Sequence, residues 1–94
     1  MGQAVQSHAL AHSSVEKQMA KEVYPGVTVD PDVVHGRPVV AGTRVPVEVV
    51  TGELAGGSTY PDVMENYHLT EEQIRAALGY VTQLLSSTMI YAAS

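Results

Sequence analysis

Three short amphipathic segments follow one another between residues 45 and 94 of this chain. The first repeats apolar side chains at Val47, Val50 and Leu54, and Gly56-Gly57 then ends it as glycines end helices. Because an amphipathic helix must cover its apolar stripe, three such helices on tight turns can bury their stripes only against one another or against another chain. The pattern predicts a trihelical bundle of the helix-turn-helix type.

The second and third segments begin with capping signals. Thr59 can cap the second segment, and Pro61 lies in the first turn, where its missing amide costs nothing. The sequence Thr70-Glu71-Glu72-Gln73 is a capping box that starts the third segment. The predicted buried stripe of the second helix is Tyr60, Val63, Met64 and Tyr67. The predicted seam of the third helix is Ile74, Leu78, Val81 and Leu85, with Ala77 and Leu84 beside it.

The N-terminal half predicts one helix and two extended stretches. A capping box at residues 13–16 predicts a short helix that runs to about Glu22. Alternation in Val27–Asp30 and the apolar run Pro38–Ala41 predict strands. The expected fold is mainly α with a short β-hairpin, and the expected division is a mobile N-terminus with a short helix (1–24) before a domain of β-hairpin and three helices (25–94).

The net charge of −5 lies entirely in the helical half of the chain. Residues 45–94 carry one cation, Arg75, and six carboxylates, whereas residues 1–44 are neutral. These carboxylates are Glu48, Glu53, Asp62, Glu65, Glu71 and Glu72. An acidic bundle repels the phosphates of nucleic acid and attracts basic proteins, so charge favours a protein partner.

Composition narrows the remaining function classes. The chain has no cysteine, which removes disulfides and thiolate sites, and it shows no apolar run long enough to cross a membrane. We expect a cytoplasmic protein that is not an enzyme, because no acid, base and nucleophile stand at a supportive spacing. We also expect no cofactor and no metal, since His8 and His12 lack a further ligand at a suitable interval. With 94 residues and no Phe or Trp, the core is small, and a homodimer would add burial.

Four stretches of sequence resemble the DUF433 family. They are Val29-Asp30-Pro31, Gly36-Arg37-Pro38-Val39-Val40, Gly42-Thr43-Arg44-Val45-Pro46-Val47 and Leu69-Thr70-Glu71-Glu72-Gln73-Ile74-Arg75-Ala76-Ala77-Leu78. The resemblance implies a β-hairpin-like start followed by a homeodomain-like helical bundle. It also implies membership among small bacterial proteins proposed as antitoxins of PIN-like nuclease toxins.

The predicted partner-binding residues are Arg37, Arg44, Glu71 and Glu72. Arg44 has two interpretations, which the sequence leaves open. It can pair with Asp30 or Asp32 to fix a turn, or it can project its guanidinium, together with Arg37, at a carboxylate cluster of the partner. PIN-type nucleases are similar in using clustered carboxylates for metal, so such an arginine would compete with the metal ion.

Transcriptional regulation through the third helix is the alternative function. Its candidate DNA-binding residues are Lys17, Lys21, Gln73 and Arg75. Glu71 and Glu72 oppose it, since both carboxylates would face phosphate oxygens if the start of that helix entered the major groove. A third interpretation is an orphan dimeric structural module with a vestigial helix-turn-helix.

Overall fold

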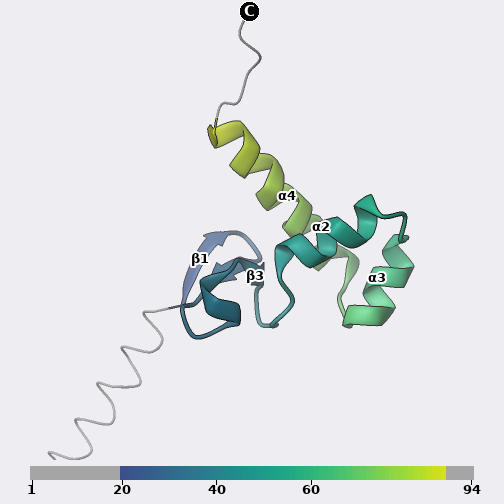
Figure 1. Ribbon diagram of the computed structural model, residues 1–94, viewed down its shortest axis with the longest axis horizontal. Helices are drawn as coiled ribbons and strands as arrows, with labels where there is room; N and C mark the ends of the chain where they lie inside the picture. Colours follow the sequence, from purple (N-terminus) through teal and green to yellow (C-terminus); the bar gives the residue numbers. More distant parts are fainter. Residues whose placement is uncertain (1–19, 89–94) are drawn as a thin grey trace, which may run out of the picture.

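The computed structural model describes residues 20–88, which form a mainly helical domain with a small antiparallel sheet (Figure 1). In chain order the elements are β1 (Lys21–Tyr24), β2 (Val27–Val29), the 3-10 turn η1 (Val34–Gly36), β3 (Val39–Val40), α2 (Val47–Ala55), α3 (Tyr60–Tyr67) and α4 (Glu71–Thr88). The strands lie in the order β1-β2-β3. Within the described range, no helix is both long and apolar enough to cross a bilayer.

The three predicted helices are confirmed, and their ends follow from local capping. Gly57 takes a φ of +106° just after α2, a value that a side chain would resist. Thr59 and Asp62 form a reciprocal capping box at the start of α3. Thr70 and Gln73 form another before α4, with the Thr70 amide donating to Gln73 Oε1 at 2.8 Å and the Gln73 amide donating to Thr70 Oγ1 at 3.1 Å.

The predicted helix that ends near Glu22 is wrong for its last residues. Lys21 and Glu22 belong to β1, where they lie opposite Val29 and Thr28 of β2, and the rest of that segment lies outside the described residues. The expected boundary between residues 24 and 25 therefore separates two paired strands. The local helix signals are overridden here by strand pairing. The Pro25-Gly26 turn, with Gly26 at a φ of +90°, brings residues 21–24 alongside β2.

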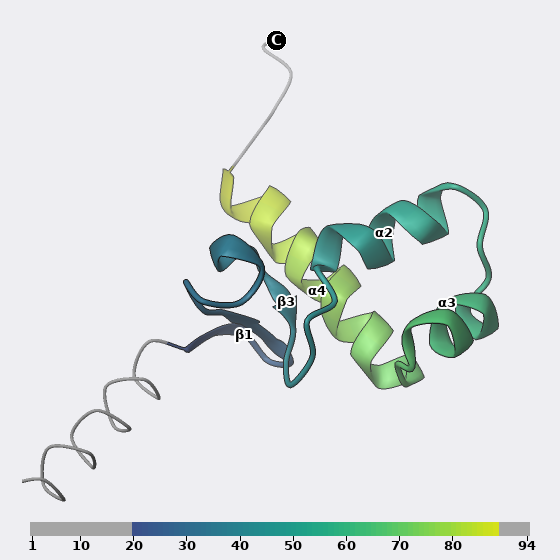
Figure 2. The ribbon, with the colours of Figure 1, turned by 60° about the horizontal axis from the view of Figure 1, so that its bottom comes forward.

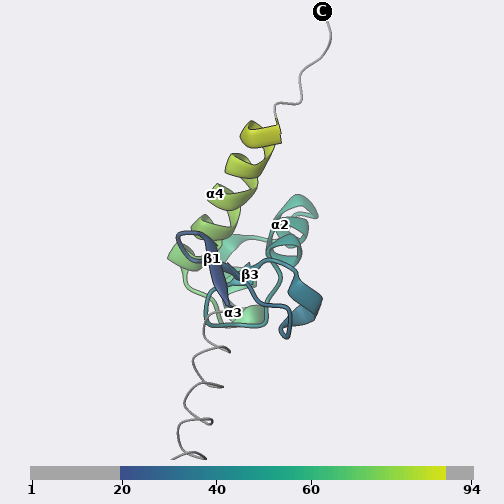
Figure 3. The same cartoon turned by 90° about the vertical axis from the view of Figure 1, so that its left-hand side faces the viewer.

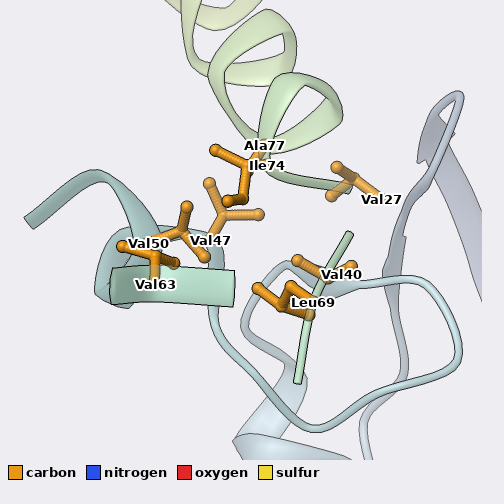
Figure 4. Packing of buried hydrophobic residues seen from close by; sticks show 8 residues of the cluster. All are labelled: Val27, Val40, Val47, Val50, Val63, Leu69, Ile74 and Ala77. Atoms are coloured by element: carbon orange, nitrogen blue, oxygen red, sulfur yellow. The ribbon is translucent and has the colours of Figure 1, made fainter. Parts of the chain in front are cut away.

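The hydrophobic core joins one face of the sheet to all three helices. Figure 4 shows its eight buried side chains: Val27, Val40, Val47, Val50, Val63, Leu69, Ile74 and Ala77. The first half of α4 is the central element, because it packs on β2 and β3 as well as on α2 and α3 (Figure 2). The core is made largely of valine and contains no aromatic side chain that is fully buried.

Two glycines permit close contact between the β1–β2 hairpin and α4. A Cβ on Gly79 would lie 2.3 Å from the hydroxyl oxygen of Tyr24, so the tyrosine ring occupies the space that a side chain would need. A Cβ on Gly26 would lie 2.8 Å from the Cβ of Ala76. Tyr24 also contacts Tyr80, with ring centroids 6.3 Å apart. The interruption at Gly79 is thus a packing requirement.

The seam predicted for α4 is only half buried. Ile74 and Ala77 are fully buried, and Leu78 and Val81 are partly buried, but Leu84 is 51% exposed and Leu85 is 59% exposed. Figure 3 shows why, since the last turns of α4 extend beyond the sheet and the other two helices. Within residues 20–88, no neighbouring element reaches far enough along α4 to cover these two leucines.

Candidate functional site

A tight turn between β3 and α2 presents Arg44 to solvent. The Thr43 hydroxyl donates to the Val40 carbonyl at 2.8 Å and accepts from the Val45 amide at 3.0 Å, while Val40 and Val45 share a backbone hydrogen bond of 2.9 Å. Gly42 supplies the left-handed conformation at the tip, with a φ of +78°. Glycine and threonine therefore build the turn, and the exposed arginine beside them is left free to contact another molecule.

The predicted pairing of Arg44 with Asp30 or Asp32 is wrong. No ion pair joins Arg44 to any residue in the described range. The Asp30 carboxylate instead accepts a hydrogen bond from the Asp32 amide at 2.9 Å, which fixes the loop after β2 as an Asx turn. The interpretation of Arg44 as a contact with a partner stays a prediction.

Arg37 lies on the other side of β3 and has an intramolecular partner. Its guanidinium Nη1 is 2.5 Å from Glu48 Oε1 in the first turn of α2. Both side chains are more than half exposed, so the pair is screened by water and contributes little to stability. Its consequence is electrostatic, because one cation and one carboxylate cancel on this surface.

The start of α4 keeps a net negative charge, because its one cation is paired with one of its two carboxylates. Arg75 Nη2 lies 2.7 Å from Glu71 Oε2 one turn earlier on the same helix. Gln73 is committed to the cap at Thr70, and Glu72 is exposed. The spacing of Glu71 and Arg75 by four residues is a known signal for such a pair, and it indicates this contact from sequence alone.

A hollow of about 430 Å³ lies between this first turn and the sheet. Its lining residues are Pro25, Gly26, Val40, Ala41, Thr70, Glu72, Gln73 and Ala76. Most of them are apolar or small, and Glu72 is the one charged member. The hollow is therefore an apolar surface with a single carboxylate at its edge.

Two hydrogen-bonded groups with shifted pKa values stabilise α2 and α3: one links the two helices, and the other caps the start of α3. The Tyr67 hydroxyl donates to Glu53 Oε2 at 3.1 Å, and the ionised phenolate would face that carboxylate, so the pKa of Tyr67 is raised. The Thr59 amide donates to Asp62 Oδ2 at 3.0 Å and lowers the pKa of Asp62. Both hydrogen bonds stabilise local structure.

The structure thus brings some candidates together and separates others. Glu71, Gln73 and Arg75 share the start of α4, Arg37 and Arg44 flank β3, and Lys21 lies exposed on β1. Lys17 lies outside the described residues. Between residues 20 and 88, no three His, Asp or Glu side chains are grouped so that they could hold a metal ion. Glu48 was missed as the partner of Arg37, since nothing local links residues 11 positions apart.

The three helices packed on a small antiparallel sheet define a small, mainly helical α+β domain. The chain belongs to the DUF433 family, described as proteins of unknown function, which matches residues 27–81. That match runs from the start of β2 to the middle of α4. It leaves β1 and the last turns of α4 outside the shared region.

Two solved structures are similar to this chain. Rv2018 from Mycobacterium tuberculosis is 40% identical with a TM-score of 0.51, over 55% of this chain and 24% of that one, so the chain spans about a quarter of the mycobacterial protein. A DUF433 member from Anabaena variabilis is 24% identical with a TM-score of 0.60, over 89% of this chain and 77% of that one, and this likeness shows the fold alone. No curated protein matches the chain.

Proposed function

We propose that this chain is a non-enzymatic protein-binding module that acts as an antitoxin and neutralises a PIN-like nuclease toxin. The observation that carries the proposal is the pair between Glu71 and Arg75, 2.7 Å apart in the first turns of α4. In this pair Glu71 neutralises Arg75, the one cation of residues 45–94, and the neighbouring carboxylate of Glu72 remains. The helix end that would approach DNA is therefore acidic, which suits a basic protein and repels phosphate.

Electrostatics supports a nuclease as the partner. A protein that binds RNA presents cations to the phosphate backbone, and an acidic surface is complementary to it. Complementary fields speed the encounter of two proteins and disfavour partners of the wrong charge. The described residues of this chain carry the whole net charge of −5, since Lys17 and Glu16 cancel in the segment outside them.

Arg44 supplies the second contact in this proposal. Its turn is held by the Thr43 hydroxyl, and its guanidinium has no described partner. A planar guanidinium binds carboxylates in a bidentate manner, so Arg44 can occupy a carboxylate cluster that a nuclease uses for metal. Arg37 has a smaller role, because Glu48 already binds it.

Co-expression of this chain with a PIN-like nuclease from the same genome tests the proposal. The wild-type chain should co-purify with the nuclease and restore growth, whereas Arg44→Glu and the double variant Glu71→Lys, Glu72→Lys should lose both effects. Glu65→Lys, an exposed charge reversal on α3, is the matched control and should behave as the wild type. Full neutralisation by the Arg44 and Glu71/Glu72 variants, with folding verified by circular dichroism, would show that these contacts are not used.

A DNA-binding regulator is the second candidate. The arrangement of α3, a three-residue link and α4 favours it, because a homeodomain-like helix-turn-helix places its last helix in the major groove. Lys21, Gln73 and Arg75 would then contact DNA, with Lys17 from the segment outside the described residues. Gel shifts on the upstream region of its own gene separate the candidates, since several phosphate contacts give a steep loss of affinity with salt, and the antitoxin proposal expects no such binding by the chain alone.

A further inference from the structure

The apolar stripe of α4 continues past the domain that covers it. We call residues 81–88 the overhang of α4. Leu84 and Leu85 follow Ala77 by seven and eight residues, which places them on the side of the helix that is buried at Ile74 and Ala77. Yet these two leucines are 51% and 59% exposed. One stripe therefore has a covered half and an uncovered half.

A hollow lies directly beside the overhang. It is open to solvent, has a volume of about 170 Å³ and is lined by Pro38, Val47, Glu48, Thr51, Tyr80, Val81 and Leu84. Apolar cavities of about 150 Å³ accommodate a benzene molecule, so this hollow can receive a leucine side chain. Its one carboxylate, Glu48, is paired with Arg37. The surface thus offers a protruding Leu85 and a receptive hollow next to each other.

The charge pattern identifies what covers this surface. No Asp, Glu, Lys or Arg occurs from residue 76 to residue 94. Every other helical surface between residues 20 and 88 carries carboxylates, with Glu48 and Glu53 on α2, Asp62 and Glu65 on α3, and two more at the start of α4. Two copies of a chain with a net charge of −5 repel each other wherever these carboxylates meet. The overhang is the helical surface where two copies can approach without that repulsion.

We propose that the overhang of α4 is the contact surface between two copies of this chain. The helices pack across a two-fold axis, and Leu85 of each copy enters the hollow beside Tyr80 and Val81 of the other. A two-fold contact uses the same patch twice, so it needs a protrusion and a recess on one surface, and this surface has both. The dimer forms whether or not the chain also binds a nuclease.

The size of the overhang sets the strength of the expected contact. Eight helical residues span about 12 Å, and two leucines with a shallow hollow bury less area than the roughly 800 Å² per partner of a standard interface. We therefore expect a dissociation constant in the micromolar range.

Sedimentation velocity of the full chain over a range of concentrations tests the proposal. The wild type should pass from monomer to dimer, and Leu85→Glu should raise the dissociation constant by at least about tenfold, since it buries a carboxylate without a partner. Gln83→Glu adds the same charge on the opposite side of the helix and should leave the constant unchanged. A wild-type chain that stays monomeric, or a dimer that tolerates Leu85→Glu, would falsify the proposal.

Thiol chemistry gives an independent measurement, because the chain has no cysteine of its own. Leu85→Cys should cross-link two copies on oxidation, and Gln83→Cys should cross-link far more slowly. A monomeric Leu85→Cys chain whose thiol reacts slowly with a soluble reagent would mean that another part of the same chain covers the stripe. A monomeric chain whose thiol reacts rapidly would mean that the stripe is exposed and is available to a different protein. Either result overturns the proposal.

Discussion

The two ends of α4 carry one apolar stripe but meet different surroundings. From Glu71 to Ala77 the stripe faces the sheet, α2 and α3, and Ile74 is fully buried. From Val81 to Thr88 the same pattern continues, but two leucines are more than half exposed. The comparison teaches that an amphipathic pattern shows which side of a helix seeks cover, whereas the length of its neighbours decides how much of that side is covered within the chain.

The largest difference between the two ends should appear on truncating the stripe. Ile74→Ala should lower the free energy of unfolding by about 2–5 kcal/mol, because it leaves a cavity at a site with no access to water. Leu85→Ala should change it by less than about 0.5 kcal/mol in dilute solution, where the chain is monomeric. Urea denaturation at one low protein concentration measures both, and equal losses would contradict the division of the helix.

The junction between the two ends should be the next most sensitive place. Gly79→Ala places a Cβ against the Tyr24 ring, and such overpacking costs about 1–3 kcal/mol, more than the roughly 1 kcal/mol that alanine gains in a helix. We therefore expect a net loss of about 1 kcal/mol. In a Tyr24→Ala background the same change should stabilise the chain. A loss of similar size in both backgrounds would mean that the ring does not cause it.

Removing one threonine hydroxyl at each end of α4 should give a smaller difference in the free energy of unfolding. Thr70→Ala removes the hydroxyl that accepts from the Gln73 amide and should cost about 1 kcal/mol. Thr88→Ala, the matched change in the overhang, removes a hydroxyl that donates only to the Leu84 and Leu85 carbonyls, and should cost less than about 0.5 kcal/mol. Thermal unfolding followed by circular dichroism ranks the two variants, and the reverse order would argue that the overhang contributes to the fold.

The smallest effect should be a difference in pH dependence. The Thr59 amide lowers the pKa of Asp62 below 3.8, so the stabilisation by Asp62 is present above pH 3.8 and is lost as pH falls through its folded pKa. Unfolding free energies of wild type and Asp62→Asn should thus converge on acidification. The overhang has no carboxylate, so dimer affinity should not fall in parallel while the domain stays folded. A difference that persists at low pH would contradict the role of Asp62.

The candidate site was less predictable than the helices. The pairing of Glu71 with Arg75 follows from their spacing of four residues, and the role of Arg75 in DNA binding stays a prediction. For Arg44 the sequence offered two interpretations, because a guanidinium binds a carboxylate of the same chain and a carboxylate of another protein through the same hydrogen bonds. Only the course of the turn around Thr43 shows that Asp30 and Asp32 are not its partners.

Sequence alone determined where α2 ends and where α3 and α4 begin. Caps, glycine stops and apolar spacings act between residues a few positions apart, so their physics is complete within each segment. Tertiary structure decided that Lys21–Tyr24 is a strand, that Arg37 binds Glu48 and that Leu84 and Leu85 stay exposed. Each of these depends on which distant surface arrives beside a residue, and long-range packing supplies that information.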